Sequence, residues 1–87
     1  MRVTAHSASR ILGYVHVHVA SRVYVLPVES RSLKLDDGSV LEPGLFEEDA
    51  GRYGIRVDRD APESAVRDTI EQASAEAARR FSRKLLN

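Results

Sequence analysis

The stretch from residue 11 to residue 28 reads ILGYVHVHVASRVYVLPV and has the strongest β-strand pattern in the chain. The valines from Val15 to Val25 fall on odd positions, whereas tyrosine, histidine and arginine fall on the even positions between them. Successive side chains of a strand point to opposite faces, so this alternation predicts one apolar face and one polar, aromatic face. β-Branched residues also suit a pleated, half-buried surface. We therefore expect β-structure throughout this stretch.

Two arrangements of this stretch remain open. A hairpin with the three-residue loop Ala20-Ser21-Arg22 would place Val19 opposite Val23 and gather the valines on one face, whereas a two-residue loop would mix the faces. The loop lacks the residues that turns prefer, so one continuous bent strand is the alternative. Unbroken, the stretch would span roughly 55–60 Å, at about 3.3 Å per residue. That length is too great for a small domain, so we favour the hairpin.

Length and composition narrow the class of protein. The 87 residues predict one domain over residues 1–87. The 13 acidic and 13 basic side chains balance, so we do not expect bulk attraction to nucleic acid or anionic lipid. The chain has no cysteine, which excludes disulfides and thiolate ligands and is compatible with a reducing cytoplasm. No apolar run of about 18 residues occurs, and residues 1–10 lack a signal-peptide core, so we expect a cytoplasmic protein without a membrane span.

Further β-structure is predicted on both sides of residues 11–28. Residues 1–10 are expected to form either an edge strand or a flexible tail. Asp37-Gly38 lies between the apolar runs of residues 33–41, which is typical of a hairpin with a type I′ turn. Residues 52–58 alternate between apolar and polar side chains and predict one more strand. Residues 11–58 are therefore expected to be β-rich, with two hairpins plus one strand giving four to five antiparallel strands.

The remainder of the chain, residues 60–86, has the pattern of one long amphipathic helix. Asp60 at the N-cap with Glu63 three residues later resembles a capping box, and Pro62 is tolerated in the first turn. Apolar residues recur at helical spacing and form one stripe: Val66, Ile70, Ala73, Ala77, Phe81 and Leu85. The fold class that follows is α+β, a small antiparallel sheet followed by one C-terminal helix.

The C-terminal half of this helix predicts a self-association surface. The helix would be about 39 Å long, whereas a compact domain of this size would be only about 31 Å across, so its last turns are expected to leave the sheet. Small residues would let another backbone approach, and bulky ones would need a cover. A two-fold dimer is the most economical assembly. The predicted oligomer interface comprises Ala73, Ala77, Phe81 and Leu85.

The even positions of the first stretch predict an interaction face, formed by Tyr14, His16, His18, Arg22 and Tyr24. His16 and His18 would place two imidazoles on one side of a strand, about 7 Å apart, as in some metal sites. A third ligand would have to come from His6 or from Asp36 and Asp37, and no pattern fixes one. We therefore favour no metal and no cofactor, and expect instead that these residues pair across strands on a solvated face.

A basic cluster near the chain end, Arg79, Arg80, Arg83 and Lys84, has two interpretations. It would bind an anion such as phosphate, or it would simply complement the negative end of the helix dipole. Together with the tyrosines it also suggests a nucleic-acid-binding module, which the zero net charge disfavours.

The sequence contains no glycine-rich phosphate loop and no arrangement of a nucleophile with a base. We therefore expect a non-catalytic protein–protein interaction or assembly module that forms a homo-oligomer. The first alternative is a small metal-dependent or pocket-based enzyme centred on His16 and His18, and the second is a weak nucleic-acid binder.

Overall fold

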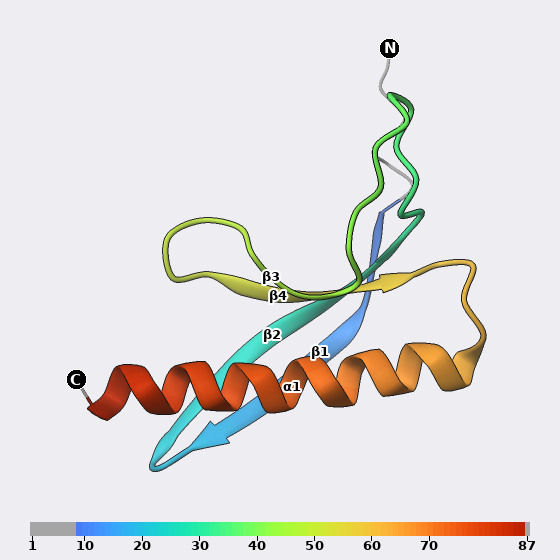
Figure 1. The fold of residues 1–87 in the computed structure, drawn as a ribbon. Helices are drawn as coiled ribbons and strands as arrows, with labels where there is room; N and C mark the ends of the chain where they lie inside the picture. The colour runs from blue at the N-terminus through green and yellow to red at the C-terminus, as the bar shows by residue number, and fades with distance from the viewer. Residues whose placement is uncertain (1–8, 87) are drawn as a thin grey trace.

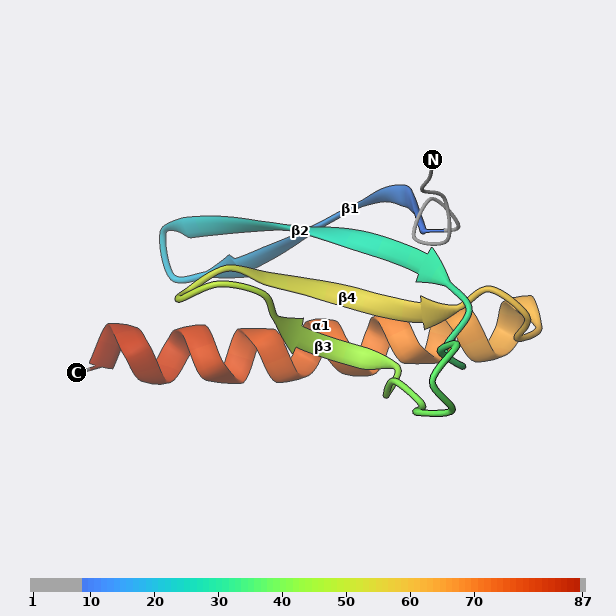
Figure 2. The same cartoon turned by 90° about the horizontal axis from the view of Figure 1, so that it is seen from above.

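The computed structural model describes residues 9–86, which fold into a four-stranded sheet and one helix (Figure 1). The elements are β1 (Arg10–Val19), β2 (Arg22–Arg31), β3 (Gly44–Glu47), β4 (Tyr53–Asp58) and α1 (Glu63–Leu86). The strand order is β1-β2-β4-β3, and α1 lies against one face of the sheet (Figure 2). This is the predicted α+β class, although residues 1–8, where a tail or edge strand was considered, lie outside the described residues. Within the described chain, no helix combines the length and apolar character needed to cross a membrane.

The first stretch is a hairpin, as predicted, but its turn is shorter than the predicted three-residue loop. Val19 pairs with Arg22, so the loop consists only of Ala20 and Ser21. Ala20 has a φ of 55°, the left-handed conformation that suits a tight hairpin but is disfavoured for alanine. Because a one-residue change of register turns every side chain of one strand to the other face, the valines of β1 and those at the start of β2 face opposite sides.

One pair of strands is parallel, which the expectation of an antiparallel sheet missed. β2 pairs in parallel with β4, placing Val28 beside Ile55, while β4 pairs antiparallel with β3. After β2 the connection of residues 32–43 leaves room for one strand, and the chain then forms β3 at the edge of the sheet. The strand β4 later fills the position between β2 and β3. The tight connection after β3 then returns the chain between β3 and β2.

The second predicted hairpin is reduced to one isolated bridge, between Lys34 and Val40. Gly38 has a φ of 90°, and the Asp37 carboxylate accepts hydrogen bonds from the hydroxyl and backbone N–H of Ser39 at 2.6 and 2.9 Å. These bonds favour the ionised carboxylate and lower the pKa of Asp37. A turn therefore forms around these residues, but it is not the predicted type I′ turn, because Asp37 lacks the positive φ that such a turn needs at both central residues. Residues 32–43 project away from the sheet (Figure 1), and a two-stranded ribbon without a packing surface does not extend.

The helix begins at Glu63, three residues later than the predicted start at Asp60. The Pro62 carbonyl accepts a hydrogen bond from the Val66 N–H at 3.1 Å, which is the first i to i+4 hydrogen bond of the helix. Asp60 belongs instead to a turn, in which its N–H donates to the Asp58 carboxylate at 2.9 Å. The predicted capping box is therefore wrong, because the side chain of Asp58 competes for the backbone of this segment.

The core lies between α1 and the sheet, and only the C-terminal end of α1 extends past the β1–β2 turn (Figure 2). The molecule measures 44 × 29 × 21 Å, and α1 runs along its greatest dimension beside the hairpin (Figures 1 and 2). The domain is therefore elongated rather than spherical, and its ten-residue strands lie beside most of the helix. The buried apolar residues are Val17, Leu26, Val28, Ile55, Val57, Ala73, Ala77 and Phe81.

Candidate functional site

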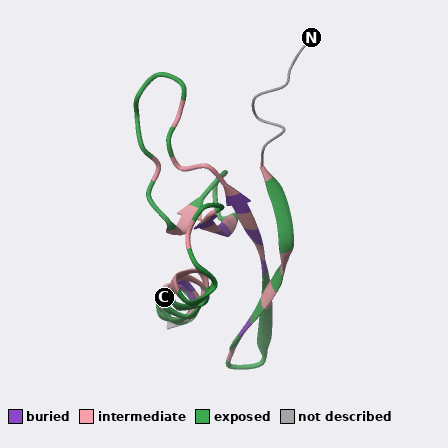
Figure 3. Ribbon diagram, turned by 90° about the vertical axis from the view of Figure 1, so that its right-hand side faces the viewer, coloured by how far each residue is buried: buried purple, intermediate pink, exposed green. Residues whose placement is uncertain are grey.

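The outer side of the β1–β2 hairpin, turned away from α1, exposes a row of uncharged side chains. Register places three pairs directly opposite one another across the two strands. Tyr14 is 65% exposed, and Val23 and Val25 are 54% and 55% exposed. No described element lies over this side of the two strands (Figure 3). We name it the open face, and its pairs are Tyr14–Pro27, His16–Val25 and His18–Val23.

The open face differs in membership from the predicted interaction face. Tyr14, His16 and His18 lie on it, whereas Arg22 and Tyr24 belong to the opposite side of the hairpin. The Tyr24 ring is half-buried and stacks on Phe81 with ring centroids 4.0 Å apart.

On β2, the odd-numbered residues Val23, Val25 and Pro27 share the outer side with the tyrosine and histidines of β1, whereas even-numbered residues had been predicted there. These three residues could have been placed on the outer side from the sequence only if the length of the turn had been known. A two-residue loop at Ala20-Ser21 sets this register, but neither residue is typical of such a loop.

The outer side of β4 and β3 is covered by its own side chains. The Phe46 ring lies over Gly54, where an added Cβ would approach the ring's Cζ to 2.8 Å. The Arg56 guanidinium lies 4.3 Å from the centroid of the same ring. This arrangement closes the outer face over β4 and β3, so the exposed valines of the four strands are confined to the hairpin.

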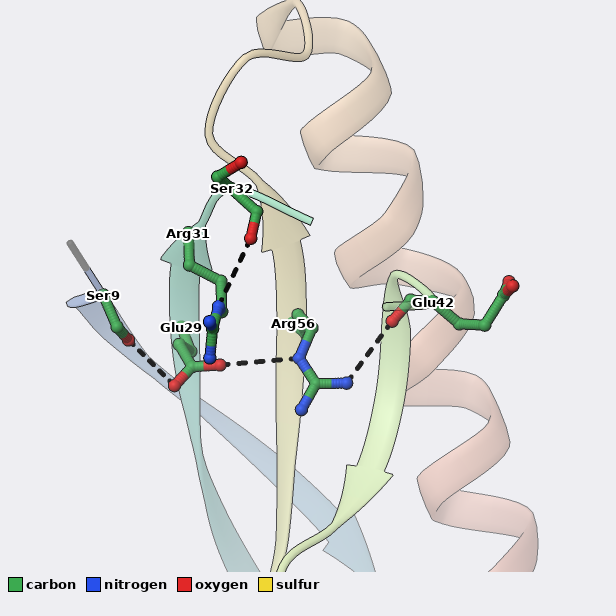
Figure 4. Close-up of polar contacts among 6 residues, drawn as sticks. All are labelled: Ser9, Glu29, Arg31, Ser32, Glu42 and Arg56. Carbon is green, nitrogen blue, oxygen red and sulfur yellow. Dashed lines mark hydrogen bonds and ion pairs between the residues drawn. The ribbon is translucent and has the colours of Figure 1, made fainter. Parts of the chain in front are cut away.

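An ion pair separates the two halves of the outer face (Figure 4). Arg56 Nε lies 3.5 Å from Glu29 Oε1, and both side chains are largely shielded from solvent. The hydroxyl of Ser9 donates to Glu29 Oε2 at 2.8 Å, and Arg56 Nη1 donates to the Glu42 carbonyl at 3.5 Å. Within the described residues, Glu29 Oε1 and Arg56 Nε have no hydrogen-bond partner and meet only each other. Sequence reasoning missed this cluster, because it depends on β2 and β4 being neighbours.

The predicted oligomer interface on α1 is mostly part of the protein's own core. Ala73, Ala77 and Phe81 are 3%, 0% and 5% exposed, and they pack against the sheet. Tyr24 and Tyr53 cover Phe81, so this ring needs no second subunit to bury it. Leu85 remains 38% exposed, on the last turn.

The predicted basic cluster is divided between two sides of α1. Arg80 donates to Glu76 at 2.9 Å, and a hydrogen bond with the Tyr53 side chain raises its pKa. The Lys84 ammonium lies 5.4 Å from the Tyr53 ring centroid. Arg79 and Arg83 lie on the other side, in a groove beside β1. The four cations therefore do not form one site.

The alternative enzyme has no assembled centre in the described residues. No three potential ligands among histidine and the acidic residues come together in the described chain. The segment with Asp36 and Asp37 lies at the end of the sheet opposite the hairpin turn (Figures 1 and 2), and His6 lies outside the described residues. A pocket of about 420 Å³ exists between β2 and the connection from β3 to β4, but neither His16 nor His18 lines it.

Comparison of the chain with protein-family models, with curated proteins and with solved structures finds no match. The site is therefore interpreted from its own chemistry.

Proposed function

We propose that this protein is a non-catalytic interaction module that forms a homodimer by packing its open face against the open face of a second copy. The observation that supports the proposal is the pair of valines, Val23 and Val25, each more than half exposed beside Tyr14. Contiguous apolar surface on a small protein typically marks a contact with another macromolecule. The absence of cysteine is compatible with a reducing cytoplasm, where we infer that the module works.

A second copy suits this face because the face carries no carboxylate, lysine or arginine. In a two-fold contact each residue meets its own equivalent or a neighbour, so charged side chains would bring like charges together. The members of the open face are tyrosine, histidine, valine and proline. Two such sheets would pack face to face at about 10 Å.

The free energy gained by burying the open face favours association, but only moderately. Each valine is about half exposed, so its burial would contribute about 1 kcal/mol, and a dimer would bury four of them with two tyrosines. The loss of translational and rotational freedom opposes this gain. We therefore expect a reversible dimer that dissociates on dilution.

The mass of the protein in solution tests the proposal. The wild-type protein is expected to approach twice its 9.7 kDa chain mass by light scattering at high concentration. A Val23→Glu/Val25→Glu variant is expected to be a monomer, because the pairing would place carboxylates in contact. The matched control is Val40→Glu, since Val40 is 62% exposed and lies outside the hairpin. A wild type that stays monomeric, or a double variant that retains the dimer mass, would refute the dimer.

A further inference from the structure

The strand β1 forms an edge of the sheet, and from Gly13 to Val19 it carries none of the usual features that protect such an edge. Its ten residues pair with β2 on one side, and no other described strand pairs with it. Natural edge strands are usually short, charged or interrupted by proline, because their free N–H and C=O groups attract other strands. The opposite edge, β3, is only four residues long. The segment from Ile11 to Val19 has neither a charge nor a proline, and its one irregularity is a bulge between Ile11 and Gly13.

A basic groove lies where this edge meets the helix. Its volume is about 460 Å³, and its lining combines the end of β1 with one side of α1. Val19 and Ala78 are its partly buried apolar members. The residues that line it are His18, Val19, Ala78, Arg79, Ser82 and Arg83.

The two arginines of the groove are exposed, and in the part of the chain that the structure describes neither is engaged in an ion pair. Within the described residues, neither Arg79 nor Arg83 has a carboxylate within ion-pair distance, whereas Arg67 and Arg80 on the same helix are each paired with a glutamate. Arg79 and Arg83 are four residues apart on α1, so they lie on one side of the helix, about 6 Å apart along its axis. The groove therefore offers two unpaired guanidinium groups at a defined spacing.

We propose that an extended acidic peptide binds here by adding a strand to the free edge of β1. Such a strand would lie about 4.8 Å from β1, and its backbone would bond with the unpaired groups of that edge. Every second side chain of the added strand would face α1, at a spacing of about 7 Å. Carboxylates at two alternate positions would then match Arg79 and Arg83. The expected recognition motif is therefore an extended segment with acidic residues at positions i and i+2.

Charge complementarity favours this partner over a second copy of the chain. The corresponding segment of another subunit, Ile11 to Val19, has no carboxylate to offer to Arg79 and Arg83. The proposal does not depend on the dimer, because packing of two open faces leaves the edge of β1 uncovered. It therefore goes beyond the proposed function and assigns a second surface.

Fluorescence anisotropy with a labelled peptide of about eight residues, alternating glutamate and threonine, tests this proposal. The full chain is expected to bind it saturably at physiological salt. An Arg79→Gln/Arg83→Gln variant is expected to bind at least about tenfold more weakly, because two charge-assisted hydrogen bonds are lost. The control is Arg59→Gln/Arg67→Gln, which removes the same charge from exposed arginines outside the groove. Circular dichroism would check that both variants keep the fold.

A second peptide separates strand addition from simple attraction of charges. Methylation of alternate backbone nitrogens keeps every carboxylate but removes the donors that an added strand needs. This peptide is expected to lose binding, and the backbone amides of β1 should shift in NMR spectra only with the unmodified peptide. The proposal fails if no saturable binding occurs, if the methylated peptide binds equally well, or if the groove variant binds like the control. Tighter binding of a single-stranded RNA through the same arginines would overturn it in favour of a nucleic-acid site.

Discussion

The two sides of the β1–β2 hairpin carry similar apolar residues and meet opposite environments. On the inner side Val17, Leu26 and Val28 are at most 5% exposed beneath α1, whereas Val23 and Val25 on the outer side are more than half exposed. The strands supply valine to both sides, so composition does not distinguish them. The single helix covers only one face of the sheet, so within residues 9–86 the outer side of the hairpin keeps apolar residues that no other element covers.

The outer face over β4 shows that such exposure is not unavoidable in this fold. There the Phe46 ring covers Gly54, and Arg56 lies over the ring. The same sheet thus closes one half of its outer face with its own side chains and leaves the other half open. This contrast is what makes the hairpin the candidate for a partner.

The largest expected change in the free energy of unfolding comes from a comparison of two truncations in β2, one on its inner side and one on its outer side. Leu26→Ala is expected to lower the free energy of unfolding by about 2–4 kcal/mol, because Leu26 is only 1% exposed and its loss leaves a cavity. Val25→Ala, on the neighbouring residue, is expected to cost less than about 1 kcal/mol within the monomer. Urea denaturation at one low protein concentration compares them. Equal losses would mean that the two sides are not packed differently.

A smaller effect is expected where the outer face is closed. Gly54→Ala is expected to cost about 1–2 kcal/mol, because the new methyl group displaces the Phe46 ring and weakens its contact with Arg56. Gly13→Ala is the control, since a Cβ there would meet nothing within 4 Å. The same denaturation measurement applies to both variants. If Gly54→Ala unfolds at the wild-type urea concentration, Phe46 does not close this half of the face.

The smallest expected effect is a gain at the turn that sets the register. Ala20→Gly is expected to raise the free energy of unfolding by up to about 1 kcal/mol, because glycine adopts the φ of 55° without the Cβ clash of alanine. Ser21→Gly, which relieves no positive φ, is expected to be neutral or destabilising. Under this explanation thermal melts show a raised melting temperature for Ala20→Gly and no increase for Ser21→Gly. A loss of stability in Ala20→Gly would contradict the two-residue turn and the arrangement of faces that follows from it.

Local sequence patterns predict the secondary structure of this protein well, because it depends on residues that are neighbours in sequence. The 3.6-residue period from Val66 to Leu85 predicts α1, and the alternation across residues 11–28 and 52–58 predicts strands that the structure contains. A turn also forms around Asp37 and Gly38, although it is not the predicted type I′ turn and only one bridge flanks it in the described chain. The predicted site was less successful, because a face of a hairpin depends on a register that a single turn residue decides.

Which segments are strand or helix, and that one side of each is apolar, can be inferred from the local sequence, because side-chain periodicity is a local property of the backbone. What those apolar sides contact depends on the tertiary structure. It covered Phe81 with Tyr24 and Tyr53, placed β4 beside β2 so that Arg56 reaches Glu29, and left Val23 and Val25 exposed. These outcomes depend on strand order and register, which arise from contacts between residues distant in the chain.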